Sequence, residues 1–432
     1  MNHSYMNSRL IRFLLIVIFS GLTGYVIGVS KIKIEWANYQ PHIEISSKEP
    51  PSSISHVDFT PLWTVMQKLE ASYYQKTAID SQKMLNGAIS GLVASLDDPY
   101  TVYLPPQQND DFKEVMAGKF EGIGAELGIK DKQIIVQAPL DNSPAVKAGL
   151  KPLDMILEVN GKSTAGWTLA QTVDQIRGPK GTTVSLLIFQ EKAKEPKTVS
   201  IIRDTIVIKS VAYWVKPVKD IKKITLNAKL KTYSDEKVAF IRLSQFGDSA
   251  NQEWVNAIND ISIEVQRDKS VKGIIVDLRN NPGGYLTQAV FIASEFVKNG
   301  TIVMEENREN VQRKLPVSRQ GLLTELPVVV LLNKGSASAS EIVAGALRDH
   351  NRAKIVGETS FGKGTIQQAE DLGGGSGIHV TIAKWLTPKG NWIHGKGLVP
   401  DIEVALKETD DINPSSDTHD SQLEAAVIEL MK

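Results

Sequence analysis

The stretch LPVVVLLNKGSASASEIVAGALRDHNRAKIVGETSFGKGTIQ, residues 326–367, decides the fold of this chain. It opens with an unbroken apolar run, Val328 to Leu332, which predicts a strand buried on both faces. A turn follows at residues 333–335, and the pattern from Glu341 to Leu347 predicts a helix. Repeated strand and helix units joined by short turns indicate an α/β core.

Three alternating serines, Ser336, Ser338 and Ser340, lie at the junction between this strand and this helix. Backbone N–H groups are unpaired at the start of a helix, and the helix dipole favours negative charge there. Such a position suits the oxyanion that forms in acyl transfer. The residues alone do not choose among the three serines.

A second turn, residues 357–364, places Lys363 between two glycines soon after the apolar pair Ile355-Val356. A free lysine has a pKa near 10.4, so a lysine base needs a pKa lowered by burial or by positive charge. The glycines allow the backbone to fold tightly over the amine. No acidic residue directly flanks it, although Glu358 would oppose the shift if it pointed inward.

Histidine offers rival bases. His350 follows Ser338 by twelve positions, most of them helical, which places the two about 18 Å apart at 1.5 Å per residue. We therefore expect His350 to be a helix-end residue that interacts favourably with the dipole. Nothing in the contexts of His379 and His394 recommends them as bases.

The segments GSASASEIVAGAL and VGETSFGKGTIQQ resemble those of the C-terminal processing (tail-specific) peptidases. Members of this family are serine peptidases that use a Ser-Lys pair. The resemblance implies that Ser338 is the nucleophile, Lys363 the general base and Gln367 the residue that orients the lysine. Deprotonated Lys363 would take the proton of Ser338 and later give one to the leaving amine.

A second glycine turn lies in GIIVDLRNNPGGYLTQAV, residues 273–290, which predicts a buried strand, a turn and a helix. Its DLRNN segment matches the family, and Gly283 and Gly284 end the turn. The resemblance implies an oxyanion hole made by the N–H of Ala339 and one of these glycines, without settling which one. It also implies a crotonase-like core of ββα units in spiral arrangement.

Residues 117–204 resemble a PDZ domain, because five segments occur in the PDZ order, beginning with Gly122-Ile123-Gly124-Ala125. Glycines there let N–H groups converge on a terminal carboxylate, and the next strand edge can pair with an extended peptide. Arg177 matches an arginine of the family's PDZ domains. We consider it a candidate sensor of PDZ position at the peptidase core, with a solvated turn arginine as the alternative.

The N-terminus carries Arg9 and Arg12 before an uncharged run, residues 13–30. As a helix this run would be about 27 Å long, close to the hydrocarbon thickness of a bilayer. We expect residues 1–30 to be an uncleaved membrane anchor, with a signal peptide as the alternative. The body would then lie on the extracytoplasmic side of the cell membrane, periplasmic or extracellular.

The rest of the chain divides by composition and pattern. We expect a linker, an N-terminal helical segment that packs on the core as a platform, the PDZ domain, the peptidase core and a C-terminal tail with a short helix; these are residues 31–57, 58–116, 117–204, 205–404 and 405–432. Within the core, the lysine-rich stretch 214–236 predicts an added hairpin with a solvated, charged face.

Composition excludes several function classes. Lys+Arg balances Asp+Glu at 49 each, which argues against nucleic-acid binding. No cysteine occurs, so disulfides and a cysteine nucleophile are excluded, and the seven histidines show no metal-ligand spacing. We therefore expect no metal and no cofactor.

The expected function is that of an exported serine endopeptidase that recognises protein or peptide substrates with accessible C-termini through its PDZ domain. The alternative is a catalytically inactive, membrane-tethered PDZ scaffold, although a scaffold need not keep Ser338, Lys363 and Gln367. A third possibility is an enzyme at rest in a closed state, with the PDZ domain over its groove. An oligomer or an adaptor partner stays open.

Overall fold

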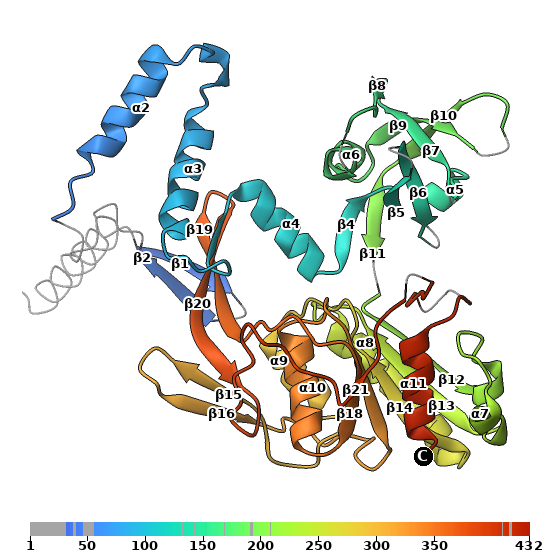
Figure 1. The fold of residues 1–432 in the computed structure, drawn as a ribbon. Helices are drawn as coiled ribbons and strands as arrows, with labels where there is room; N and C mark the ends of the chain where they lie inside the picture. Colours follow the sequence, from blue (N-terminus) through green and yellow to red (C-terminus); the bar gives the residue numbers. More distant parts are fainter. Residues whose placement is uncertain are drawn as a thin grey trace, which may run out of the picture. The chain divides into compact units, whose positions relative to one another are not determined.

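The computed structural model describes residues 32–37, 40–45, 56–130, 133–140, 143–151, 153–167, 169–190, 193–207, 209–407, 409–413 and 417–432. The chain forms two compact units, residues 1–85 and 86–432. Figure 1 shows helices and strands in both units.

The first unit contains a small hairpin and helices. Strands β1 and β2 pair in antiparallel fashion within residues 31–57, where we expected a linker. The sequence signal for this hairpin is the period-two alternation of Ile32, Ile34 and Trp36. The elements are β1 (Ile32–Ala37), β2 (Gln40–Ile45), α2 (Thr60–Ser72), η2 (Lys76–Ala78) and α3 (Ser81–Ala94), which ends in the second unit.

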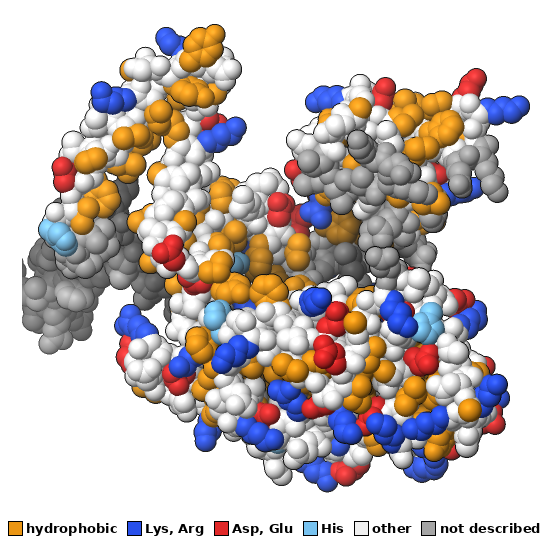
Figure 2. Space-filling view, viewed as in Figure 1, with side chains coloured by type: hydrophobic (Ala, Val, Ile, Leu, Met, Phe, Trp, Pro, Cys, Tyr) orange, Lys and Arg blue, Asp and Glu red, His pale blue; other side chains and the backbone are white. Residues whose placement is uncertain are grey.

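Helices α2 and α3 bury almost nothing. No residue of α2 is buried, and Val93 is the buried residue of α3. Figure 2 shows apolar side chains on the surface of this region. Trp63 on α2, Leu92 on α3 and Tyr74 between them are exposed. The expected platform on the core stays a prediction for these two helices.

The region with PDZ resemblance is a β-sheet with two helices. The strand order is β10-β9-β7-β6-β5, with β8 beside β7, so β5 is an edge strand. Its buried core includes Val136, Ile156 and Leu186. The elements are β5 (Ala125–Lys130), β6 (Gln133–Pro139), α5 (Pro144–Lys147), β7 (Met155–Val159), β8 (Lys162–Ser163), α6 (Leu169–Ile176), β9 (Thr183–Phe189) and β10 (Lys197–Ile202).

Two strands join this region to the rest of the second unit. β4 (Lys119–Gly122) enters it and β11 (Asp204–Val207) leaves it, and the two pair in antiparallel fashion. Both attachments of the domain therefore run through one hydrogen-bonded ribbon.

The central sheet has the order β12-β13-β14-β17-β18-β21. β12 is antiparallel to β13, and the other neighbours are parallel. The elements are β12 (Val211–Pro217), β13 (Lys237–Leu243), α8 (Ala250–Arg267), β14 (Val271–Asp277), α9 (Leu286–Ala293), β17 (Val328–Leu332), α10 (Ala339–Asp349), β18 (Ala353–Gly357), β21 (Ile402–Glu403) and α11 (Ser421–Leu430). The loops after β14, β17 and β18 consequently meet at one edge of the sheet.

Both faces of this sheet are covered. Val328, Val330 and Leu332 of β17 join a core cluster with α8, α9 and α10, whereas Val329 and Leu331 join a second cluster with α11. The prediction of a strand buried on both faces is confirmed. Full burial of such a side chain contributes about 1.5–3 kcal/mol, so β17 is a firm base for the turn that follows it.

The lysine-rich stretch differs from the expectation. Its first part is β12, which pairs along its whole length with β13, and the rest forms η3 (Val218–Asp220) and α7 (Ala228–Thr232). Val218, Ile221 and Leu230 are buried in the second core cluster. The prediction of a solvated face is therefore wrong for its apolar residues, which alternate with lysines and cover the sheet.

A second, antiparallel sheet has the order β16-β15-β20-β19, with β3 on β20. Helix α4 lies against its hairpin, where the buried Asn109 donates to Asp371 Oδ1 at 3.0 Å and to the Gly375 carbonyl at 2.9 Å. The elements are β3 (Val102–Leu104), α4 (Pro106–Met116), β15 (Thr301–Asn307), β16 (Gln312–Pro316), β19 (Thr365–Gly373) and β20 (Ser376–Leu386). Residues 98–116 are thus built into the sheet that follows Lys363.

Within the described part of the chain, no helix combines the length and the apolar character needed to cross a membrane. The apolar run at residues 13–30 lies outside the described residues.

Candidate active site

Ser338 is the N-cap of α10, directly after the turn that ends β17. Its backbone has φ 55° and ψ −114°. A residue with a side chain is strained in this region, and a serine at a sharp turn between strand and helix is presented outward from the sheet.

The three alternating serines have different surroundings. The hydroxyl of Ser336 donates to the Leu278 carbonyl at 2.9 Å, and that of Ser340 donates to the Asn281 carbonyl at 2.9 Å. Both residues are fully buried, whereas Ser338 is half-buried and lines a cavity. The structure therefore separates the middle serine from its neighbours, which the residues alone could not do.

This cavity, the peptidase groove, has a volume of about 510 Å³. It brings together all six residues that were predicted for the catalytic pair, its orienting amide and the oxyanion hole: Gly283, Gly284, Ser338, Ala339, Lys363 and Gln367. α4 forms part of its wall through Phe112, Val115 and Met116.

Lys363 is half-buried in the turn before β19. Burial lowers the pKa of its amine, and the charge of Asp98 opposes this effect. Its Nζ lies 5.0 Å from the centroid of the Tyr100 ring. Glu358 instead pairs with Lys334 at 3.5 Å, so the acidic residue that opposes the shift comes from far earlier in the chain.

Glu341 connects the two halves of the site. Its buried carboxylate accepts from the N–H of Ser338 at 2.8 Å and from the N–H of Lys363 at 2.9 Å through Oε2. Oε1 accepts from the N–H of Gly362 at 2.7 Å and from the hydroxyl of Ser360 at 2.5 Å. Burial raises the pKa of Glu341 despite these donors. The Ser-x-x-Glu spacing of a capping box was visible in the sequence, but its link to the lysine turn was not.

Gln367 lies on β19 opposite Thr381. Its Nε2 donates to Thr365 Oγ1 at 2.9 Å and to Thr381 Oγ1 at 3.2 Å. Among the described residues, no hydrogen bond joins Gln367 to Lys363, or the amine of Lys363 to Ser338.

The two glycines of the second turn have different environments. The N–H of Gly283 donates to Asn281 Oδ1 at 2.9 Å, and a Cβ on Gly283 would lie 2.8 Å from the Cβ of Ser338. Gly284 packs against Phe246, where a Cβ would lie 2.1 Å from the Phe246 carbonyl oxygen. Within the described residues, the N–H groups of Gly284 and Ala339 have no protein acceptor.

The histidines take three roles. His350 is the C-cap of α10, and its Nε2 lies 2.7 Å from the Thr301 carbonyl, which confirms the expected helix-end position. His379 lines the peptidase groove with its ring edge-on to Phe112 at 4.4 Å, and both burial and Lys363 lower its pKa. Nδ1 of His394 accepts from the N–H of Gly364 at 3.3 Å.

The predicted peptide site of the PDZ region lies where β4 ends and β5 begins. Gly124 has φ 71°, and a Cβ there would lie 2.5 Å from the Cβ of Ser143, so glycine is required. Gly122, Ile123, Gly124 and Ala125 lead directly into the edge strand β5. Among the described residues, the N–H groups of Ile123 and Gly124 have no protein acceptor.

Arg177 follows α6 and contacts the ribbon that enters the domain. Its guanidinium lies 5.0 Å from the centroid of the Phe120 ring on β4. Burial raises the pKa of Glu114 on α4, and the charge of Arg177 opposes this effect. Arg177 is thus near the helix that lines the peptidase groove.

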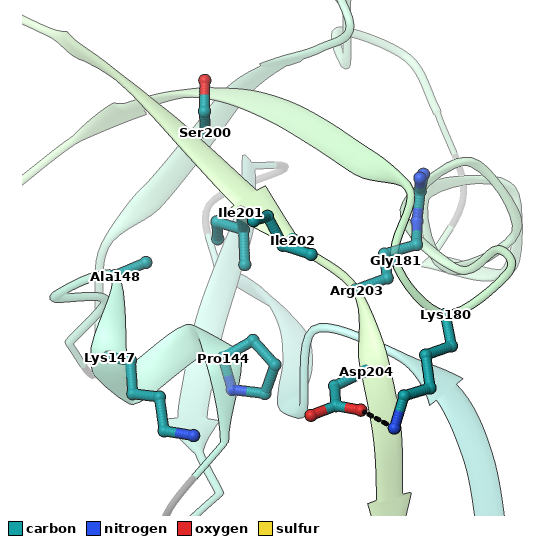
Figure 3. A pocket seen from close by; sticks show the side chains of 10 residues that line it. All are labelled: Pro144, Lys147, Ala148, Lys180, Gly181, Ser200, Ile201, Ile202, Arg203 and Asp204. Carbon is teal, nitrogen blue, oxygen red and sulfur yellow. Dashed lines mark ion pairs between the residues drawn. The ribbon is translucent and has the colours of Figure 1, made fainter.

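A separate hollow of about 440 Å³ lies on the PDZ region between α5 and the end of β10. Figure 3 shows the ion pair of Lys180 with Asp204, 2.7 Å apart, at its rim. None of the predicted site residues lines it. In the described part of the chain, no group of three or more acidic, histidine or cysteine side chains is placed to hold a metal ion.

Three family profiles match the chain. Peptidase family S41 matches residues 237–404, the PDZ domain matches residues 113–189, and the activating protease CtpB N-terminal domain matches residues 24–107. The fold and the groove therefore define a peptidase of family S41 with a PDZ domain, and the α/β class expected from the sequence is confirmed.

Named relatives narrow this class. The chain is 37% identical over 350 residues to the carboxy-terminal processing protease CtpA of Bacillus subtilis (strain 168), covering 81% of this chain and 70% of that protein. It is 39% identical over 350 residues to CtpB of the same organism, covering 80% of this chain and 68% of that protein. The crystal structure of a Bacteroides fragilis NCTC 9343 protein ascribed to the S41 proteases has a TM-score of 0.55 at 15% identity, covers 90% of this chain and 98% of that chain, and is similar in fold. The chain belongs to the carboxy-terminal processing peptidases, which are serine-type endopeptidases.

Proposed function

We propose that this peptidase hydrolyses peptide bonds with Ser338 as nucleophile and Lys363 as general base. The observation that carries the proposal is that both residues line one groove while a single buried carboxylate, that of Glu341, holds both of their backbone N–H groups. This shared acceptor fixes the separation of the two backbones.

The chemistry follows from the environment of each group. Burial lowers the pKa of Lys363, so a larger share of the amine is neutral and can accept the hydroxyl proton near neutral pH. Ser338 Oγ then attacks the scissile carbonyl and forms an acyl-enzyme, and Lys363 returns the proton to the leaving amine. Water hydrolyses the ester in a second step.

The oxyanion of each tetrahedral intermediate needs two donors. The N–H groups of Gly284 and Ala339 fit this role, since both lack a protein acceptor among the described residues, whereas the N–H of Gly283 is held by Asn281. Gly283 has the complementary role of leaving room for Ser338. Loss of one such donor typically lowers kcat by about 10²–10³.

Substrate capture is assigned to the PDZ domain. A terminal carboxylate would bind at Gly122–Ala125, and the chain before it would add as a strand to the free edge of β5. The required glycine at position 124 and the open N–H groups beside it support this assignment. The substrates would then be proteins with an accessible C-terminal tail.

We also propose that the body lies outside the cytoplasmic membrane, and the support for this comes from the sequence of the N-terminus alone. Arg9 and Arg12 precede the apolar run 13–30, which suits an anchor with the body on the far side of the membrane. Fractionation of cells with an antibody to the body, before and after a high-salt and carbonate wash, tests the tether. Recovery of the protein in the soluble cytosolic fraction would contradict it.

The catalytic proposal is tested by labelling with a phosphonate probe and by cleavage of an unfolded protein. Wild type should be labelled at Ser338 and should cleave, and Ser338→Ala should lose both signals. Ser340→Ala is the matched control, because it removes a buried hydroxyl that donates to Asn281; it should keep labelling at Ser338 and cleavage while it lowers the melting temperature. Cleavage by Ser338→Ala at the wild-type rate would refute the proposal, and absence of both signals in wild type would favour the inactive scaffold.

A further inference from the structure

The turn at residues 98–101 lies in the segment 24–107 that matches the CtpB N-terminal domain, far from the matched peptidase core in sequence, yet it reaches the proposed base. The family profile covers residues 237–404, whereas this turn precedes β3 and α4. The ring of Tyr100 covers the amine of Lys363, with 5.0 Å between Nζ and the ring centroid. Tyr100 is itself half-buried, and burial together with the charges of Glu341 and Asp98 raises its pKa.

The turn is fixed in place by a chain of hydrogen bonds. The carboxylate of Asp98 accepts from the N–H of Tyr100 at 3.0 Å and from the hydroxyl of Thr101 at 2.7 Å. That hydroxyl accepts from the N–H of Thr381 at 3.0 Å. The hydroxyl of Thr381 accepts in turn from the amide of Gln367 at 3.2 Å. The turn is thus tied to the strands that follow Lys363.

We propose that the Asp98–Thr101 turn completes the active site, with Tyr100 as a positioning residue whose ring shields the Lys363 amine from water and Asp98 as the charge that acts on that amine. The proposal rests on the role of Lys363 as general base. It assigns these residues to the peptidase site although they precede the PDZ domain in the chain.

The two residues act in opposite directions on the proton of Lys363. The ring removes water from the amine, and loss of hydration disfavours the ammonium form. The carboxylate of Asp98 favours the ammonium form by its negative charge. A cation also gains from the face of an aromatic ring. Burial outweighs the charge of Asp98, since the pKa of Lys363 is lowered overall.

Three other titratable groups lie around the amine or beside Tyr100. Glu341 from α10 holds the backbone N–H of Lys363, His379 from β20 lines the same groove, and the ring of His394 lies 6.0 Å from that of Tyr100. Burial and the charge of Lys363 lower the pKa of His379. None of the three changes in the variants below.

The test is the pH dependence of kcat/KM for cleavage of an unfolded protein by the full chain. A deprotonated base gives a rate that rises with pH through its pKa. Tyr100→Ala should move this rising limb to higher pH by about one unit, with about a tenfold loss at pH values below the limb. Tyr100→Phe keeps the ring and should restore the position of the limb. Asp98→Asn should move the limb to lower pH.

Controls separate this role from a structural one. Tyr103→Leu removes another aromatic ring from the same segment, on β3, away from the amine; it should lower stability and leave the limb in place. Tyr100→Leu fills the space without a ring and keeps the proposal testable if Tyr100→Ala does not fold. If Tyr100→Ala and Tyr100→Leu lost the same share of the rate at every pH, with the rising limb unmoved, the proposal would be overturned. A shift of the limb to higher pH in Asp98→Asn would also overturn it. Ser338→Ala in the same assay tests the proposed function separately, because full activity of this variant would refute the Ser338–Lys363 pair.

Discussion

Ser338 and Lys363 line the same groove, but the fold holds them by different means. Ser338 lies on a backbone that is set by its own strand and helix, and the hydroxyls on either side of it are used inside the fold. Lys363 lies on a glycine turn, and the walls around its amine come from residues 98–116 and from β20. The nucleophile is thus placed by local structure and the base by long-range contacts, so substitutions should separate the two.

The largest expected effect comes from the base itself. Lys363→Ala should lower kcat/KM by about 10²–10⁴, the usual contribution of a general base. The matched control is Lys334→Ala, since Lys334 lies in the nucleophile turn, is exposed and pairs at 3.5 Å with Glu358; it should stay within about twofold of wild type.

The same amine determines the pH dependence of the wild type. Because burial lowers its pKa from the ordinary 10.5, the rate should rise with pH through a limb below that value, and Lys363→Ala should have no such limb. A limb retained in Lys363→Ala would assign the titration to another group.

The next largest effect is expected at Glu341, which connects the backbone of Ser338 with that of Lys363. Glu341→Gln keeps the shape of the side chain but turns an amide toward backbone donors that now share one carboxylate. We expect about 3 kcal/mol of lost stability, from donors left without an acceptor, and about a hundredfold loss of kcat/KM from misplacement of both residues. Urea unfolding and steady-state kinetics measure the two losses.

Glu358→Gln is the control for that change, because Glu358 lies in the same lysine turn but faces Lys334. It should change stability by less than about 0.5 kcal/mol. If Glu341→Gln kept wild-type kinetics, the carboxylate would support the fold alone, and the two sides of the site would be positioned independently.

The smallest effect is expected at Gln367. Its amide donates to Thr365 and Thr381, so Gln367→Ala should act on Lys363 only through the packing of β19. We expect about a tenfold loss of kcat, comparable with one hydrogen bond, and a KM within about threefold of wild type. A loss as large as that of Lys363→Ala would show that Gln367 contacts the amine directly during catalysis.

The two sides also differ in what the sequence could predict. The apolar run of β17, the serine triplet and the helix that follows are adjacent in sequence, and their positions follow from periodicity and turn chemistry. The central sheet was predicted as an α/β core for the same reason. The choice of Ser338 needed either the resemblance or the structure, because the three hydroxyls differ only in tertiary contacts.

The residues that surround Lys363 could not be predicted from the local sequence pattern. Asp98 and Tyr100 lie some 260 residues before Lys363, and no periodicity connects them with it. Glu341 had a visible role as a helix cap, but its bonds to the lysine turn depend on the packing of β18 beside β17. The lysine-rich stretch differs from its prediction because charge dominates its composition, whereas Val218, Ile221 and Leu230 determine where it packs.

The backbone of Ser338 also bears on whether a chain of this fold is an active enzyme or an inactive scaffold. A left-handed conformation costs a residue with a side chain about 1–2 kcal/mol, and glycine escapes most of that penalty. A protein that only displayed a peptide-binding module would fold more firmly with glycine at position 338. Stability of the fold alone would therefore favour glycine over serine at position 338. The nucleophilic hydroxyl explains why a serine is present there.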